Sequence, residues 1–200
     1  INRTDWLTKI PYFIFSVIFG IINITGSTLV ADKYTLPPTI MDKILYSFMA
    51  FGLYVVKLFV PVGLTVIHSF PEKGTQEYTL LLVTGILTLS LMVFAVLKFF
   101  KRSAWISGGM LFFMACIFPV LHLVAYNSAL IYERFTYVAS IGIFMAVVNA
   151  DEVFPSWKKW REKILIPLLI VFLFLSYSHI PVWKNPVTLW SDVIEKNPRA

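Results

Sequence analysis

An acidic and a basic residue, Glu133 and Arg134, stand at the start of an apolar stretch of only 16 residues, 135–150. Sixteen helical residues reach about 24 Å, which is less than the roughly 30 Å apolar core of a bilayer. Asp151 and Glu152 hold the other end in water, so the shortfall is expected beside Arg134. An arginine at that depth faces a cavity or pairs with an acid, and its forked guanidinium suits a phosphate. The pair is therefore a candidate phosphate-binding site.

The alternative is a structural role, in which Arg134 only snorkels to lipid headgroups and Glu133 merely pairs with it. His68 follows a long apolar segment and is a second candidate for contact with a headgroup. The three histidines have no mutual ligand spacing and the chain has one cysteine, so no metal site is expected. The outer acids form no close pair near a span, so no residue of this chain is assigned a catalytic role.

The composition places these residues in a membrane protein. Of 200 residues, 58% are hydrophobic, 16% aromatic and only 14% charged. Soluble domains average roughly 25% charged residues, so this chain has too few charges to cover a surface in water. A soluble enzyme, a DNA-binding domain and a disordered tail are excluded. The net charge of +6 is attributed to basic loops between spans and not to nucleic-acid binding.

The fold class expected from these features is an all-α polytopic membrane helical bundle. A segment that differs from the other apolar stretches, 44–70, contains Lys57 near its middle. Its small and polar residues from Lys43 to Lys57 recur on one helical face, which is typical of a helix lying in the membrane interface. We therefore expect one outer interfacial amphipathic helix, 44–70, and about five spans. The predicted spans are 10–27, 78–97, 104–125, 135–150 and 164–180.

The basic residues favour this topology. With 44–70 on the outer surface, nine Lys and Arg fall in short inner segments, and eight are spread over longer outer segments. Such an enrichment of inner loops is expected of membrane proteins. If 44–70 spanned instead, the split would be nearly even and Lys57 would lie in lipid.

Both ends of the sequence predict a piece of a longer protein. The chain opens on an isoleucine without the features of a signal peptide, and its last residues lose apolar continuity. From Val187 the pattern favours an amphipathic helix that ends at Asn197, before Pro198. Residues 1–182 are therefore assigned to a membrane domain fragment and 183–200 to a linker on the outer side.

The segment from Glu133 to Gly142 resembles the E-R-x-x-Y-x-x-S-x-G motif of multi-span proteins that carry tetratricopeptide repeats (TPR) behind their membrane domain. The closing residues from Trp183 to Pro198 are similar to the linker into the first repeat of those proteins. The segment from Lys57 to Pro71 resembles a domain in their middle. The chain thus resembles the transmembrane and tetratricopeptide-repeat O-mannosyltransferase family.

This resemblance implies the C-terminal part of the membrane domain of a GT-C-type glycosyltransferase. Such an enzyme is mannosyltransferase-like and uses a polyprenyl-phosphate sugar as donor; its catalytic acid lies in a first outer loop that no segment here matches. The chain would contribute recognition of the carrier lipid and hold no cofactor. Arg134 would meet the donor phosphate, and the candidate site comprises Arg134, Glu133, Tyr137, His68 and Lys57.

The partners implied are membrane lipids, the lipid-linked sugar and a protein acceptor or partner bound by the downstream TPR domain, without nucleic acid. A bacterial inner membrane is favoured over the endoplasmic reticulum. A non-enzymatic scaffold that displays TPR repeats for protein–protein interaction is the alternative function. A transporter is less favoured, because the predicted spans hold few polar residues at the membrane midplane.

Overall fold

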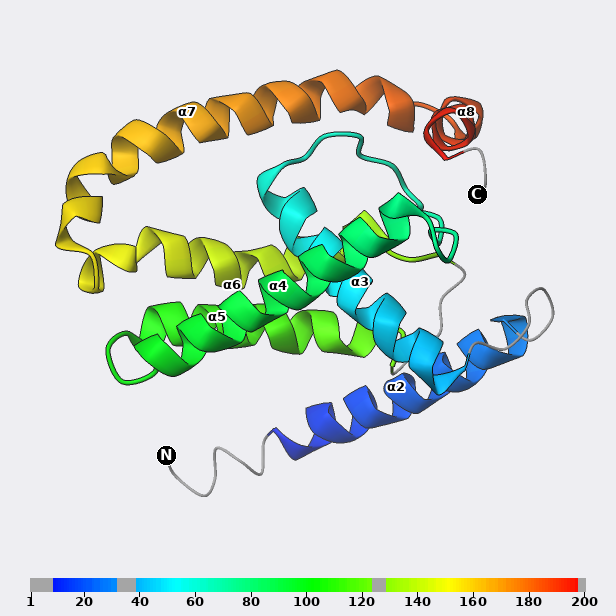
Figure 1. Ribbon diagram of the computed structural model, residues 1–200, viewed down its shortest axis with the longest axis horizontal. Helices are drawn as coiled ribbons and strands as arrows, with labels where there is room; N and C mark the ends of the chain where they lie inside the picture. The colour runs from blue at the N-terminus through cyan, green and yellow to red at the C-terminus, as the bar shows by residue number, and fades with distance from the viewer. Residues whose placement is uncertain (1–8, 32–38, 124–128, 198–200) are drawn as a thin grey trace.

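The computed structural model describes residues 9–31, 39–123 and 129–197, without the side chains of 23, 24 and 26–31. The prediction of an all-α chain is confirmed for this part: its only extended pairing is an isolated antiparallel bridge between His68 and Ile131. Figure 1 shows the arrangement of the helices. They are α2 (Ile10–Ala31), α3 (Ile40–Phe59), α4 (Gln76–Phe99), α5 (Ala104–Ile117), α6 (Thr136–Val148), α7 (Pro155–His179) and α8 (Pro186–Lys196).

Two pairs of helices cross at glycines, where their backbones touch. Gly109 of α5 faces Gly142 of α6, and a Cβ on either residue would overlap the carbonyl oxygen of the other. In the same way, α3 and α4 cross where a Cβ on Gly85 would overlap the backbone of Phe48. Small residues are a common means of helix association in membranes, because close approach accumulates dispersion contacts along the whole interface.

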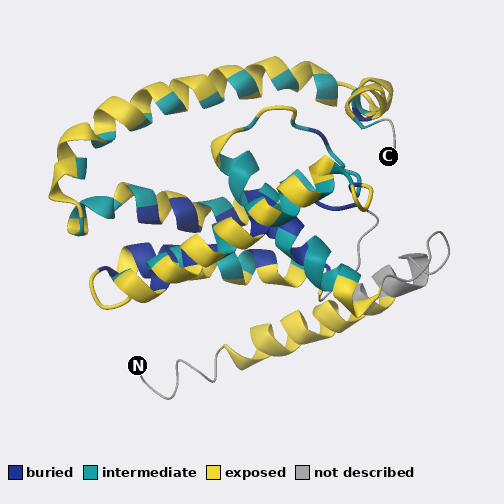
Figure 2. Cartoon of the chain, viewed as in Figure 1, coloured by how far each residue is buried: buried dark blue, intermediate teal, exposed yellow. Residues whose placement is uncertain are grey.

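The core lies among α3, α5 and α6, whereas α2 and α7 are mostly exposed (Figure 2). Met49, Phe113 and Ile117 are fully buried, and the rings of Phe51 and Phe113 meet edge-on with centroids 6.0 Å apart. No residue of α7 is buried, and every residue of α2 whose burial is described is exposed. Apolar surface on this scale is unfavourable in water.

Two helices are long and apolar enough to cross a membrane by length and composition. They are α4 and the continuous helix Pro155–Trp183, which joins α7 to the 3₁₀ turn after it. Shorter apolar helices cover Ile10–Ile22 and Ala104–Val120. The bounds of α7 differ most from the predicted span 164–180, because the basic run before residue 164 is helical as well. The predicted span 104–125 is too long, because α5 ends at Ile117 and the 3₁₀ turn after it ends at Val120; residues 124 and 125 of that span and residues 198–200 of the linker lie outside the described residues.

The prediction of one helix over 44–70 is wrong. α3 ends at Phe59, and the chain up to Phe70 is not helical, with Pro61 among its first residues. The polar stripe of α3 is also not turned toward water: Ser47 and Tyr54 are 4% and 1% exposed. Ser47 instead accepts a hydrogen bond from the N–H of Leu123 (3.0 Å). The stripe is a packing face, because its small side chains let neighbouring segments come close.

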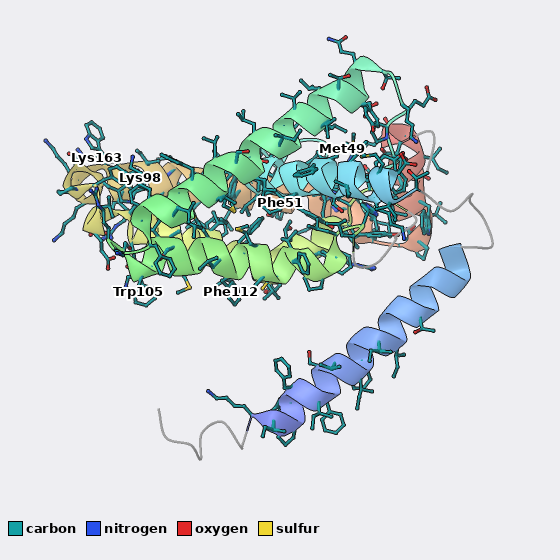
Figure 3. All side chains as sticks on the ribbon, turned by 60° about the horizontal axis from the view of Figure 1, so that its bottom comes forward. Met49, Phe51, Lys98, Trp105, Phe112 and Lys163 are labelled. Atoms are coloured by element: carbon teal, nitrogen blue, oxygen red, sulfur yellow. The ribbon has the colours of Figure 1, made fainter. Side chains whose placement is uncertain are left out.

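The basic loops gather at one end of the bundle. Lys98, Trp105 and Lys163 lie at the same end in Figure 3. The contact that joins the end of α4 to the start of α7 is an edge-on pair between Phe99 and Phe154, with centroids 5.8 Å apart. The start of α6 and the end of α7 lie toward the other end (Figure 1). The residues predicted to bind phosphate are found there.

Candidate functional site

A cavity of about 430 Å³ lies between α3, α6 and α7. Four of the five predicted site residues line it, namely Lys57, Glu133, Arg134 and Tyr137. The fifth, His68, contacts Glu133 from behind the cavity wall. The other lining residues are Tyr54, Leu58, Pro61, Leu64, Ile131, Thr136, Ser140, Phe144, Phe172, Leu175 and Ser176. The structure therefore brings the sequence-predicted residues to one place.

The charged side chains of the wall lie near the start of α6, whereas apolar wall extends farther along the helices. Arg134 lies in the short 3₁₀ turn before α6, and Phe144 lies ten residues farther along that helix. That separation is about 15 Å along a helix axis. Phe172 and Leu175 of α7 add further apolar surface. The arrangement fits a molecule with a charged head and an apolar body.

The guanidinium of Arg134 makes no hydrogen bond or ion pair with another residue in the described part of the chain. Its central carbon instead lies 5.1 Å from the ring centroid of Tyr132 and 5.3 Å from that of Phe135. Cation–π contacts of this kind hold the side chain in place. They leave its N–H donors unused, so the guanidinium remains available to an anion.

Glu133 does not pair with Arg134, so that part of the structural alternative is wrong. Its Oε1 lies 2.8 Å from Nε2 of His68 and accepts the backbone N–H of Thr65 at 3.2 Å. An ionised carboxylate only accepts hydrogen bonds, so His68 carries its proton on Nε2 in this contact. The carboxylate of Glu133 is thus engaged by His68, and no acid of the described residues pairs with Arg134.

Lys57 lies at the end of α3 and folds back over the chain that follows. Its Nζ donates to the carbonyl oxygens of Val62 (2.6 Å) and Gly63 (3.1 Å). Gly63 has a φ of 62°, a left-handed conformation that favours glycine. Burial lowers the pKa of the Lys57 ammonium, Glu133 acts in the opposite direction, and Lys196 adds to the lowering. Two of the three donors of Lys57 are occupied, which leaves one for a ligand.

The non-helical segment Val60–Phe70, here called the cavity loop, is held mainly by side chains from other elements. Lys57 donates hydrogen bonds to two of its carbonyl oxygens, and Glu133 accepts one from the N–H of Thr65. From the far end of the sequence, Lys196 donates to Leu64 O (2.9 Å) and Asn197 donates to Ile67 O (3.0 Å). Backbone groups without a helix or a sheet need such partners, so these side chains fix the shape of one cavity wall.

The motif residues of α6 divide between two faces of the helix. Arg134, Tyr137 and Ser140 are spaced by three and all line the cavity, where Tyr137 is 82% exposed. Ser140 donates from Oγ to the carbonyl of Tyr137 (2.8 Å). Gly142 lies on the packing face against α5. One short sequence thus supplies both a cavity surface and a helix crossing.

Sequence reasoning missed several residues of this site. Tyr54 is 1% exposed and its hydroxyl accepts the N–H of Tyr132 (3.4 Å); burial raises the pKa of its phenol to about 12. Thr65, Lys196 and Asn197 were not predicted either. The last two lie more than 120 residues from the loop that they hold, and no local pattern indicates such a contact.

No family model, no curated protein and no solved structure matches this chain. Within the described residues, no group of three His, Cys, Asp or Glu side chains is placed to hold a metal ion.

Proposed function

We propose that the cavity binds the phosphate of a polyprenyl-phosphate sugar, with Arg134 as the principal contact. The observation that carries this proposal is the guanidinium itself, which lines a cavity without an acid partner among the described residues. Guanidinium and phosphate form paired, charge-assisted hydrogen bonds. A phosphate contact would satisfy an arginine that, among the described residues, is held by two aromatic rings.

The rest of the cavity supports a lipid-linked donor over a free anion. Phe144, Phe172 and Leu175 give it apolar walls, and α7 presents apolar side chains along its exposed length. A polyprenyl chain would continue along such surface at no cost of exposure to water. Lys57 and Tyr137 supply further polar groups at the charged end.

The broader assignment rests on the sequence resemblance. The chain is proposed to be the C-terminal part of the membrane domain of a GT-C-type, mannosyltransferase-like glycosyltransferase in a bacterial inner membrane. Five segments would span the bilayer, with TPR repeats following on the outer side. α4 and the helix Pro155–Trp183 have the length and composition for a span, and the exposed apolar surface of α2 supports its inclusion.

The test is binding of a polyprenyl-phosphate sugar to the full-length protein in lipid nanodiscs. Arg134→Ala removes the charge-assisted contact, worth about 1.5–3 kcal/mol. A loss of about 2 kcal/mol weakens binding roughly thirtyfold. Arg134→Lys keeps the charge without the fork, so its loss should be partial.

The matched control is Arg102→Ala, which removes an exposed arginine from the basic end of the bundle. It should bind the donor as the wild type does. Melting temperatures of all variants would show that they fold equally well. Equal donor affinity for Arg134→Ala, Arg102→Ala and the wild type would refute the phosphate role and favour a scaffold that displays repeats.

A further inference from the structure

α8 has two distinct faces, of which only one is covered. Val193 is 1% exposed and lies on the covered face, from whose end Lys196 and Asn197 reach the cavity loop. An adjacent face carries Val187 and Ile194, which are 75% and 64% exposed, with Trp190 between them at 51%. These three exposed residues are spaced i, i+3 and i+7, so they form one apolar stripe along the helix.

α8 follows the apolar helix Pro155–Trp183 after a very short connection. Asn185 caps α8 by accepting the N–H of Thr188 (2.9 Å), and Pro186 stands at its first position. An N-cap followed by proline marks the start of a new helix, so α8 is separate from the helix before it. In Figure 1, α7 runs across the view while α8 is seen end-on, so the chain changes direction between the two helices.

We propose that the stripe Val187–Trp190–Ile194 is a membrane-docking surface that inserts into the bilayer interface. The inference rests on the proposed placement of α7 across the membrane. If α7 crosses the bilayer, a helix that turns away from its end is placed to lie along the membrane plane. The stripe then faces the acyl chains, and the opposite side of α8 faces water.

Two observations favour lipid over a protein partner. Exposed apolar side chains recur at every third or fourth residue from Phe174 and Tyr177 of α7 through Ile180 and Trp183 to the stripe. The medium that covers α7 therefore also reaches α8. Trp183 and Trp190 are residues that concentrate at the boundary between acyl chains and headgroups.

The charges of α8 indicate what kind of lipid surface it fits. α8 itself holds one basic residue, Lys196, and two acidic residues, Asp192 and Glu195, and Lys196 is paired with Asp192 at 2.6 Å. Without net positive charge, docking is driven by apolar contact and does not require anionic lipids. Because Lys196 also holds the cavity loop, docking of α8 fixes one cavity wall relative to the membrane surface.

The experiment uses spin labels on single cysteines in a Cys116→Ala background of the full-length protein, reconstituted in zwitterionic lipid vesicles. Accessibility to oxygen and to a water-soluble nickel complex reports whether each site lies in lipid or in water. Ile194→Cys tests the stripe, and the adjacent Glu195→Cys is its matched control on the polar side. Leu173→Cys, on an exposed position of α7, reports the membrane placement separately.

The expected result is an oxygen-to-nickel ratio several-fold higher at Ile194 than at Glu195, and highest at Leu173. The ratios should stay the same when anionic lipid is added. A high ratio at Leu173 with equal, low ratios at Ile194 and Glu195 would overturn the docking of α8 and leave the membrane placement intact. Exclusion of both reagents from Ile194 would also overturn it, because a protein would then cover the stripe. A low ratio at Leu173 would reject the placement of α7 and the inference with it.

Discussion

Replacing Glu133 by alanine removes an acceptor that two groups of the cavity loop share. Oε1 of Glu133 accepts from His68 Nε2 (2.8 Å) and from the N–H of Thr65 (3.2 Å). A donor left without an acceptor away from water costs about 1–3 kcal/mol. Thr65 is only 3% exposed, so water replaces the lost acceptor poorly there; the His68 side chain is 15% exposed and recovers part of it.

Glu133→Ala should therefore lower the free energy of opening the cavity loop by about 2 kcal/mol. Local opening then becomes roughly thirtyfold more frequent. Hydrogen–deuterium exchange of the loop amides, read by mass spectrometry of the protein in nanodiscs, measures this opening. Faster exchange is expected for peptides that contain Thr65. Exchange in α5 should stay unchanged, because the hydrogen bonds of the Glu133 carboxylate go to Thr65 and His68.

Two further variants separate a specific loss from general destabilisation. Glu133→Gln keeps a carbonyl oxygen that can accept both donors, so its exchange should lie between those of the wild type and Glu133→Ala. Glu152→Ala removes an exposed glutamate at the basic end of the bundle and should leave the loop unaffected. Unchanged loop exchange in Glu133→Ala, or an equal increase in Glu152→Ala, would refute the role assigned to this carboxylate.

Two other predictions concern the frame around the site. Gly109→Ala should destabilise the protein by about 1–3 kcal/mol, because its Cβ overlaps the carbonyl oxygen of Gly142, whereas Gly108→Ala meets nothing within 4 Å and should stabilise it by up to about 1 kcal/mol. Melting temperatures that rank these two variants in the reverse order would contradict the observed crossing. Lys73 donates to Asp42 (2.6 Å) and holds the pKa of that carboxyl below its ordinary value of 3.8. The stabilisation is thus complete above about pH 4 and lost as the pH falls through the lowered pKa, so acidification should lower the melting temperature of the wild type more than that of Asp42→Asn.

Most of the helices and candidate residues could be predicted from the sequence, because both depend on local features. Apolar stretches of suitable length located α2, α4 and α5, and the helix predicted from Val187 is observed as α8. Charges beside a short apolar stretch located Glu133 and Arg134. These signals need only composition and spacing, which a single sequence contains.

The contact partners of those residues could not be predicted, since they depend on segments distant in the sequence and on the surroundings of the helices. The prediction for the α3 stripe, which includes Ser47 and Tyr54, assumes that the polar residues of a helix face outward to water. In helix bundles of membranes, the small and polar face of a helix is the one that packs inside. In the same way, Glu133 pairs with His68, which lies 65 residues away in the sequence, and not with its neighbour Arg134.

The central claim is that Arg134 recognises the phosphate of a lipid carrier. It is tested most directly by comparing polyprenyl phosphate with the matching polyprenol, which has the same chain and no phosphate. The wild type should bind the phosphate form about thirtyfold more tightly, from a charge-assisted contact of about 2 kcal/mol. In Arg134→Ala the two ligands should bind with nearly equal affinity. The same preference for phosphate in Arg134→Ala as in the wild type would contradict the account.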